Sequence, residues 1–477
     1  MPEPERYDAV IIGSGEGGKY LAWHLASAGQ RTAVIERRWI GGSCPNINCL
    51  PSKNEIWSAG IAHAASRAAD FGVNCGPVSV DMPTVVARKR AMVDALVAFH
   101  LDRYVASGAE LVMGSGRLVG DRTVEVALND GGRRVLAAGT LFLNVGTHAS
   151  VPDVPGLKDA HPLTHVEALD LDRLPEHLIV LGGGYVGLEL AQAYRRFGSR
   201  VTVVDRGGRL VDREDPEVSE EVERTLRAEG IDVLLSARFE QVEGQSGNHL
   251  RARVRTREGH TDLEGTDILV AAGRTPNTHG IGLEQHGVEL TEDGYIRVND
   301  RLETTAAHTW AIGECAGTPH FTHISLDDFR IIRDNLAGGQ RSTTGRLVPY
   351  CMFIDPPLAR VGMNEREARE AGIPVRVATL PASAVLRTRT TSDDRGFMKA
   401  LVRDDDRIAG FTMIGSDAGE VLAVVQVAMM AGLSYTVLRD AILTHPTMAE
   451  GLNALFSNVP APSAGERPTP DAGGGRP

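Results

Sequence analysis

Cysteine is scarce in this chain, with five among 477 residues. So few thiols cannot form the dense disulfide framework of a small secreted protein. Long apolar runs are missing too, because no stretch reaches the roughly 18–20 residues of a membrane-spanning helix. The first ten residues, MPEPERYDAV, lack the basic and apolar regions of a signal peptide. We therefore expect a soluble protein of the cytoplasm with no membrane partner.

An excess of positive charge is also absent. The chain has 50 Lys and Arg against 62 Asp and Glu, a formal net charge of −12, which gives no electrostatic reason to expect a nucleic-acid partner. The charged fraction of 23% and the hydrophobic fraction of 42% are typical of a globular protein. At 477 residues the chain is long enough for about three domains.

Two of the five cysteines, Cys44 and Cys49, lie close together in GGSCPNINCLPSK at 41–53. A disulfide across so short a loop adds little stability through chain entropy, so we expect a bond that opens and closes. A helix is expected to begin near Pro51, and its positive end would lower the pKa of Cys49. Two structural thiols or half of a metal site are the alternatives. A metal site needs further Cys or His, and none lies nearby, so we expect no resident metal.

A glycine fingerprint precedes the dithiol. It follows the apolar run 7–12, opens a helix expected to run through Leu25, and is followed by a second apolar run that ends on Glu36. This is the strand, glycine turn, helix and strand-end acid of a dinucleotide-binding unit. The glycines let backbone amides reach a pyrophosphate, and Glu36 can accept a hydrogen bond from a ribose hydroxyl. The fingerprint glycines are Gly13, Gly15 and Gly18.

The same unit recurs after the apolar run 177–181, and its second strand ends on Asp205. The first glycine and the terminal acid are 23 positions apart in both copies, since 36 − 13 and 205 − 182 are equal. Two fingerprints with equal spacing predict two dinucleotide sites. With a dithiol between them, the two sites predict an electron relay from nicotinamide to flavin to disulfide. The second set of glycines is Gly182, Gly184 and Gly187.

These motifs, with GGGYVGLE at 182–189, AAGRTPN at 271–277, TWAIGE at 309–314 and HPTMAE at 445–450, resemble the class I pyridine nucleotide-disulfide oxidoreductases. That family includes dihydrolipoamide dehydrogenase, glutathione reductase and mercuric reductase. The resemblance covers roughly residues 5–459. From 321 to 459 the sequence is similar to a bacterial copper(II) reductase branch of the reactive-chlorine response.

The resemblance implies an α/β fold with two Rossmann-like domains and a C-terminal α+β dimerisation domain. It implies FAD, NADH or NADPH as cofactors, and a homodimer whose active sites use both subunits. We expect an FAD-binding domain at 1–156 and 276–345, an NAD(P)-binding domain at 157–275, and a dimerisation domain at 346–459. The tail 460–477, rich in Pro, Gly and small polar residues, is expected to be disordered.

The resemblance also assigns roles. Cys49 would face the flavin and Cys44 would meet the oxidant, while Lys53 would pair with Glu189 beside the flavin. Tyr185 would cover the nicotinamide pocket. The further cofactor-binding residues that it implies are Gly42, Ser43, Gly146, Gly273, Arg274, Gly313 and Glu314, the last in place of the family's usual aspartate.

His445 would be the acid/base supplied across the dimer, oriented by Glu450. Taken from the residues alone, Thr447 to Glu450 fits a helix capping box, which is a sufficient structural reason for that glutamate. Lys53 and Glu189 could likewise be ordinary surface charges. The remaining cysteines, Cys75, Cys315 and Cys351, are expected to be small buried hydrophobes.

Coenzyme choice is ambiguous. Asp205 favours a free ribose 2′-hydroxyl and therefore NADH. Arg206, with Arg209 and Arg213 close behind, could clamp a 2′-phosphate, or these arginines could pair with the acids at 212–215. We expect NADH.

Three functions stay open. A dithiol can reduce a soft metal ion such as Cu(II) or Hg(II), which the closer resemblance favours in stress defence, or a small disulfide such as lipoamide. A non-catalytic flavin-binding subunit is the third. The tail has no cysteine pair of the kind that delivers mercury in mercuric reductases, which argues against efficient mercury reduction.

Secondary structure can be read from the same patterns. Helices are expected over 54–69 and 92–106, and a strand over 140–146. Alternating residues predict antiparallel strands at 398–402 and 408–414. The apolar run 421–430 is expected to be a buried helix.

Overall fold

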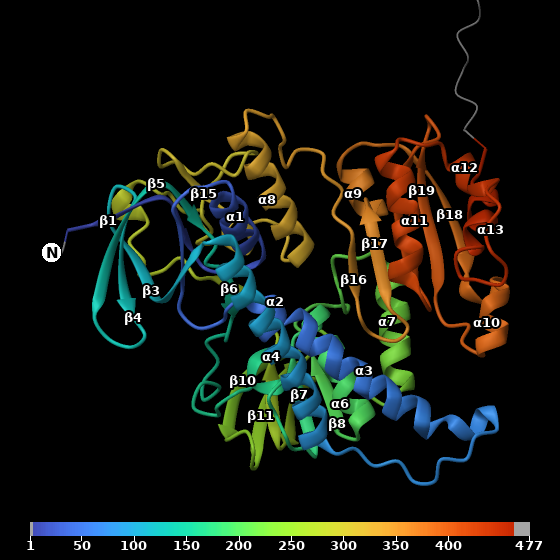
Figure 1. Cartoon of the computed structure of the whole chain (residues 1–477). Coiled ribbons are helices and arrows are strands. Elements are labelled where there is room, and N and C mark those ends of the chain that lie inside the picture. Colours follow the sequence, from blue (N-terminus) through green and yellow to red (C-terminus); the bar gives the residue numbers. More distant parts are fainter. Residues whose placement is uncertain (1–2, 462–477) are drawn as a thin grey trace, which may run out of the picture. The chain divides into compact units, whose positions relative to one another are not determined.

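The computed structural model describes residues 3–461, so the positions 462–477 of the tail predicted to be disordered lie outside the described residues. The chain divides after Val348 into two compact units, and each is described by itself (Figure 1). The first unit holds both glycine fingerprints and the dithiol, and the second holds the HPTMAE segment. The finer boundaries at 156, 275 and 345 stay predictions.

A six-stranded sheet carries the first fingerprint. β1 pairs in parallel with β2 and β5, and β15 pairs in parallel with β5, whereas β4 forms antiparallel pairs with β3 and β5. The strand expected at 140–146 is the end of β5, which stops at Leu143. The strands are β1 (Glu5–Ile12), β2 (Thr32–Glu36), β3 (Glu110–Gly120), β4 (Thr123–Leu128), β5 (Arg133–Leu143) and β15 (Thr309–Ala311).

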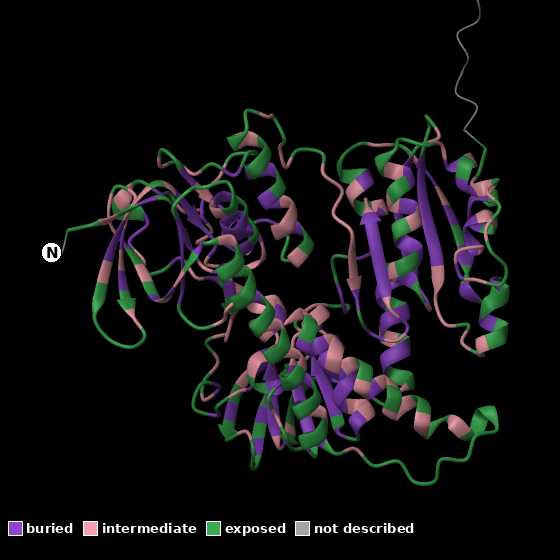
Figure 2. Cartoon of the chain, viewed as in Figure 1, coloured by how far each residue is buried: buried purple, intermediate pink, exposed green. Residues whose placement is uncertain are grey.

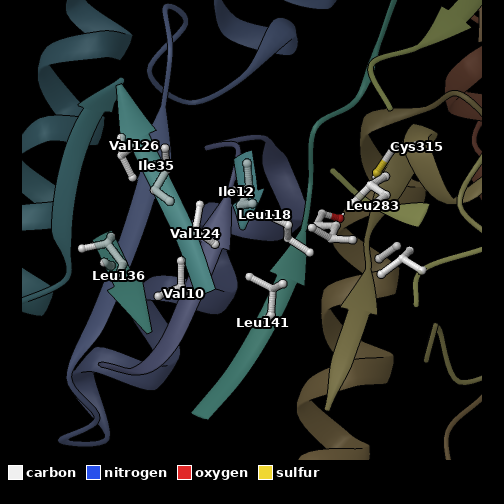
Figure 3. Close-up of a cluster of buried hydrophobic side chains, with 14 of the residues drawn as sticks. Val10, Ile12, Ile35, Leu118, Val124, Val126, Leu136, Leu141, Leu283 and Cys315 are labelled. Carbon is white, nitrogen blue, oxygen red and sulfur yellow. Dashed lines mark hydrogen bonds between the residues drawn. The ribbon is translucent and has the colours of Figure 1, made fainter. Parts of the chain in front are cut away.

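The core of this sheet is formed by apolar side chains of β1, β2 and β5, which pack with side chains from β3, β4 and the 283–316 region. Figure 3 shows Val10, Ile35, Leu141 and Cys315 among them. Cys315 is fully buried, as expected of a small hydrophobe. The same expectation is wrong for Cys75, which is exposed, and Cys351 is only half-buried.

The second fingerprint lies in a parallel sheet with the strand order β13–β7–β8–β9. An antiparallel sheet of β10, β11 and β12 belongs to the same region, and β6 pairs with β14. Both fingerprints therefore lie in βαβ units, as the sequence predicts. The strands are β6 (Thr147–Ala149), β7 (His177–Leu181), β8 (Arg200–Val204), β9 (Asp232–Leu234), β10 (Arg238–Gly244), β11 (Leu250–Thr256), β12 (Gly259–Gly265), β13 (Asp267–Val270) and β14 (Arg274–Pro276).

The helices of the first unit match the predictions in place but not in length. α3 begins at Cys49 and continues through Gly60. α4 begins at Met82 rather than Met92, because Pro83 is compatible with a first helical turn. The helices are α1 (Glu16–Ser27), α2 (Ser43–Asn46), α3 (Cys49–Ser66), α4 (Met82–Ser107), α5 (His165–Ala168), α6 (Tyr185–Phe197), α7 (Pro216–Ala228) and α8 (Thr322–Leu336).

The second unit is a five-stranded antiparallel sheet with the order β16–β17–β20–β19–β18, and the two strands predicted there are confirmed. The helix predicted at 421–430 forms within α11, but the prediction that it is buried is wrong. Val427 is 65% exposed and Met430 is 70% exposed, because α11 packs only one face on β17 and β20 (Figure 2). The elements are β16 (Tyr350–Met352), β17 (Leu358–Gly362), α9 (Glu365–Glu370), β18 (Val375–Pro381), α10 (Leu386–Thr391), β19 (Phe397–Arg403), β20 (Ile408–Ile414), α11 (Ala418–Met430), α12 (Tyr435–Arg439) and α13 (Gly451–Ser457).

Asn144, directly after β5, fastens the first fingerprint to the sheet. Its Oδ1 accepts a hydrogen bond from the Gly18 backbone N–H at 3.1 Å, and its Nδ2 donates to the Ile312 carbonyl at 2.8 Å. A Cβ on Gly15 or Gly18 would lie 2.6 Å from Asn144 Oδ1. These two glycines are thus required for the approach of α1 to β5. Sequence reasoning did not single out Asn144, since its partners are 126 and 168 positions away.

Replacing Asn144 by Ala should destabilise the first unit by about 1–3 kcal/mol, because two buried backbone groups lose their partners. Thermal unfolding followed by far-ultraviolet circular dichroism measures the loss as a lower midpoint. The matched control is Asn129→Ala, since Asn129 is exposed and its one side-chain bond, to the Arg37 carbonyl, lies at the surface. Equal midpoints for the two variants would contradict the role of Asn144.

Candidate active site

A cavity of about 440 Å³ in the first unit runs past the start of α1, the dithiol loop and the end of β5. Most of the predicted cofactor-binding residues outside the second fingerprint unit line it. Three do not, Gly18, Gly273 and Gly313; Gly18 serves packing, as described, and the Gly313 N–H donates to Asp328. The predicted residues that line the cavity are Gly13, Gly15, Glu36, Gly42, Ser43, Gly146, Arg274 and Glu314, together with Cys44 and Cys49.

The cavity fits a dinucleotide. Gly13 (φ 99°) and Gly42 (φ 83°) have left-handed backbone conformations, and a Cβ on Gly42 would lie 2.5 Å from Gly15 Cα. Bare backbone amides therefore face the cavity at the N-terminus of α1, which suits a pyrophosphate. His165 also lines the cavity, and its buried Nε2 has no hydrogen-bond partner among the described residues. Burial lowers the pKa of His165 to about 4, so this side chain is neutral and available to a ligand.

Glu36 lines the cavity as predicted, but its carboxylate also organises the loops. Oε2 accepts from the backbone N–H and the hydroxyl of Ser14 at 3.0 and 2.7 Å, and Oε1 accepts from the backbone N–H groups of Arg38 and Trp39. The Ser14 hydroxyl in turn accepts from the Gly41 N–H at 2.9 Å. The strand-end acid is thus connected through Ser14 to the first residue of the dithiol segment.

The two cysteines of that segment lie on consecutive helices. Cys44 is in α2, Cys49 is the first residue of α3, and the two sulfurs are not bonded to each other in this structure. A hydrogen bond from the Cys44 thiol is the largest factor that lowers the pKa of Cys49, to about 6. The same hydrogen bond, with burial, raises the pKa of Cys44 well above its usual range.

Two further groups lower the pKa of Cys49 against the opposing effect of burial: a hydrogen bond from Thr322 and the charge of Lys53. The predicted direction of the shift is therefore found. Its main cause is the neighbouring thiol rather than the helix end on which the prediction rested. Thr322 Oγ1 lies 3.2 Å from Cys49 Sγ and was missed at the sequence level.

Lys53 and Glu189 form the pair that the resemblance implies. Lys53 Nζ lies 2.6 Å from Glu189 Oε2, and joins α3 to α6, which pack against each other. Glu189 is 6% exposed, so it is not a solvated surface charge. The ammonium group is thus held by a buried carboxylate while its charge acts on Cys49.

Glu314, which replaces the usual aspartate, is held at the cavity wall. Arg274 Nε donates to Glu314 Oε2 at 3.2 Å and to Thr147 Oγ1 at 2.6 Å, and Thr147 also hydrogen-bonds to Glu314. The longer side chain therefore keeps its carboxylate in the lining, next to an arginine.

The second fingerprint has the close contacts that its glycines predict. A Cβ on Gly187 would lie 2.2 Å from the Gly182 carbonyl oxygen. Asp205 accepts from the backbone N–H groups of Gly183 and Gly207, both at 2.6 Å. Tyr185, on the first turn of α6, donates to Glu214 Oε1 at 2.8 Å. Gly184 is the N-cap of α6 and is open, with no atom near its Cβ direction.

Arg206 and Arg209 are exposed, and their side chains form no hydrogen bond or ion pair with any residue between 3 and 461. The alternative that they pair with the acids at 212–215 does not hold for these two arginines. They remain available to a charged ligand next to Asp205.

His445 and Glu450 lie together in the second unit. His445 Nδ1 is 2.8 Å from Glu450 Oε2, and the imidazole is 63% exposed. The predicted capping box is wrong: α13 begins only at Gly451, with Glu450 as its N-cap. The Thr447 hydroxyl accepts from the Glu450 N–H at 3.4 Å, but the glutamate carboxylate bonds to the histidine. Glu450 is therefore placed to fix the orientation of the imidazole.

Comparisons with known proteins agree with this geometry. The sequence model of the pyridine nucleotide-disulphide oxidoreductase family matches residues 7–328 of the chain. The sequence model of that family's dimerisation domain matches residues 348–455. The chain belongs to this family. As a pyridine nucleotide-disulphide oxidoreductase it is an FAD-dependent enzyme that uses NAD(P)H. Between residues 3 and 461, no helix of the enzyme is long and apolar enough to cross a membrane.

Two relatives, and a solved structure of one of them, are informative. The probable pyridine nucleotide-disulfide oxidoreductase RclA of Escherichia coli is 37% identical over 461 residues, which cover 95% of this chain and 99% of RclA. The mercuric reductase of Streptomyces lividans is 34% identical over 450 residues, which cover 94% of this chain and 94% of that reductase. The solved structure described as a Cu(II) complex of the HOCl-induced flavoprotein disulfide reductase RclA has a TM-score of 0.86, at 36% identity over 95% of this chain and 99% of that one.

Replacing Lys53 by Met should raise the pKa of Cys49 by about one unit, because the nearby positive charge is lost. At about pH 6 the thiolate fraction then falls from about one half to about one tenth. The thiolate fraction can be followed by the rate at which iodoacetamide alkylates Cys49 in the reduced protein. Mass spectrometry distinguishes this cysteine from the others.

Lys158→Met is the matched control, since Lys158 is exposed and its carboxylate partner is 3.8 Å away. Cys315, whose pKa burial raises to about 11, should stay unmodified throughout. A Cys49 midpoint that is the same in all three proteins would contradict the effect of Lys53.

Proposed function

We propose that this enzyme reduces a thiol-reactive metal ion, Cu(II) or Hg(II), with electrons from NAD(P)H that pass through the Cys44–Cys49 pair. The observation that carries the proposal is the placement of two unbonded thiols, Cys44 and Cys49, in one cavity, with Thr322 Oγ1 3.2 Å from Cys49 Sγ. The pKa of Cys49 is lowered and that of Cys44 is raised, which favours a thiolate at Cys49. Thiolates are preferred ligands and reductants of soft metal ions. The Cu(II) complex of RclA and the similar mercuric reductases point to the same class of oxidant.

The electron balance fits the pair. FAD, when bound, supplies the transfer of electrons from the reduced nicotinamide to the disulfide. A hydride equivalent carries two electrons and one proton, so the disulfide opens to a Cys44 thiol and a Cys49 thiolate. Re-forming the disulfide releases two electrons, which reduce two Cu(II) to Cu(I) or one Hg(II) to Hg(0), and the thiol proton is released.

The neighbouring residues support these steps. The Lys53 ammonium, fixed by Glu189, favours the thiolate form of Cys49. Cys44 is the thiol that meets the oxidant. The imidazole of His445, oriented by Glu450, can take up and return the Cys44 proton.

The histidine would act across a homodimer, in which His445 of the partner subunit serves the dithiol of this chain. The match of residues 348–455 to a dimerisation domain supports this assembly. So does the exposed apolar side of α11, where Val427 and Met430 would be covered. A cytoplasmic location, expected from the sequence, is part of the same proposal.

A small disulfide is the alternative oxidant, because the same thiol pair can react by thiol–disulfide exchange. A non-catalytic flavin-binding role is disfavoured by the intact pairing of Lys53 with Glu189 and of His445 with Glu450.

Anaerobic oxidation of NADH and NADPH by the purified enzyme should be fast with Cu(II) and slow with lipoamide and glutathione disulfide. Cys44→Ser should lower turnover with the metal by at least about 100-fold, because the pair can no longer cycle. Cys75→Ser, at an exposed cysteine outside the cavity, should change nothing. Turnover confined to a disulfide would make this a thiol reductase, and no turnover with any acceptor would favour the non-catalytic role.

For the coenzyme we propose that NADH is preferred and NADPH is accepted, since Asp205 disfavours a 2′-phosphate that Arg206 can contact. Arg206→Gln should raise KM for NADPH by about tenfold and leave KM for NADH unchanged. A tenfold change corresponds to the loss of about 1.4 kcal/mol from one charged contact. Arg297→Gln, at an exposed arginine on the 276–345 segment, is the control. If KM for NADPH does not change, Arg206 takes no part in coenzyme binding.

A further inference from the structure

Thr322 is the first residue of α8. It contacts Cys49 of the reactive pair, although it lies 273 positions later in the sequence. We propose that its hydroxyl stabilises the Cys49 thiolate. The hydroxyl thereby favours the reduced form of the pair and extends to lower pH the range in which Cys49 is ionised. The inference rests on the proposed redox role of Cys44 and Cys49. It adds a residue to that site which neither fingerprint nor dithiol motif contains.

The contact is direct. Thr322 Oγ1 lies 3.2 Å from Cys49 Sγ, within the range of a hydrogen bond to sulfur, and Thr322 lines the same cavity as both cysteines. A hydrogen bond from this hydroxyl lowers the pKa of Cys49. A hydroxyl donates more strongly to a sulfur that carries a negative charge than to a neutral one.

The hydroxyl has no other hydrogen-bond partner among residues 3–461, and it does not cap its own helix. Because Thr322 is the first residue of α8, no preceding helical turn offers a carbonyl to its hydroxyl. The contact that the hydroxyl does make is the one to Cys49 Sγ.

α8 is held in place by the next two turns on the same face. Ser325 Oγ accepts from the Gly17 N–H at 3.1 Å, and Asp328 accepts from the Gly313 N–H at 2.9 Å. Arg346 lies 2.6 Å from the second oxygen of Asp328, which is fully buried. Thr322, Ser325 and Asp328 are spaced by three, so they share one side of the helix. The hydroxyl is thus presented by a helix that is fixed to the first fingerprint.

The bond acts on only one redox state of the pair. In the disulfide, Cys49 sulfur is uncharged and a weak acceptor. When a hydride equivalent opens the bond, the two electrons and one proton leave a Cys44 thiol and a Cys49 thiolate, and the thiolate accepts strongly from Thr322. The hydroxyl therefore favours the reduced pair and keeps Cys49 ionised at lower pH.

Thr322→Val removes the hydroxyl at nearly constant volume and should raise the pKa of Cys49 by about one unit. Thr322→Ser should restore the wild-type value. Two readouts follow the thiolate. The first is the long-wavelength absorbance that a thiolate gives beside oxidised flavin, titrated with pH in the FAD-loaded enzyme after reduction by two electrons. The second is the pH profile of Cys49 alkylation. Thr318→Val is the matched control, because the Thr318 hydroxyl is buried nearby but faces Asp328 rather than sulfur.

A raised midpoint in Thr322→Val, with Thr322→Ser and Thr318→Val at the wild-type value, would support the inference. An unchanged midpoint in a Thr322→Val enzyme with full FAD content would overturn it while leaving the proposed function intact. A wild-type enzyme that shows no such absorbance at any pH, although both cysteines are alkylated after reduction, would contradict the placement of Cys49 beside flavin and the proposed function with it.

Discussion

The coupling between the neighbouring Cys44 and Cys49 thiols is the interaction on which the site depends. It raises the pKa of Cys44 and lowers that of Cys49, so one proton is shared unequally between the two sulfurs. Thr322 and Lys53 lower the pKa of Cys49 further, against the opposing effect of burial.

The loop that carries both thiols is held between distant parts of the chain. Glu36 and Ser14 fix the segment before Cys44 to the first βαβ unit, and Lys53 with Glu189 fixes the helix after Cys49 to the second. The dithiol thus lies where the two fingerprints are tied together.

The sequence predicts the local parts of this arrangement well. Glycine spacing, strand-end acids and the short dithiol loop have physical consequences within about 30 positions, and the structure shows the corresponding elements. Lys53 and Glu189 were paired only through the resemblance to a family. Asn144 and Thr322 could not be found, because their partners are 126 and 273 positions away and a lone Asn or Thr carries no motif. The capping box at Thr447 was wrong because His445 competes for the same carboxylate, and α11 was expected to be buried because its exposed apolar side is invisible in composition.

The most direct test of the account is to trap the cysteines during a single turnover under anaerobic conditions. One equivalent of NADH, then rapid alkylation and mass spectrometry, should show both Cys44 and Cys49 as labelled thiols. Adding two equivalents of Cu(II) before the alkylating agent should return both to an unlabelled disulfide with formation of Cu(I). If NADH is consumed and Cu(II) reduced while the pair stays unlabelled throughout, electrons bypass the dithiol and the central claim is wrong.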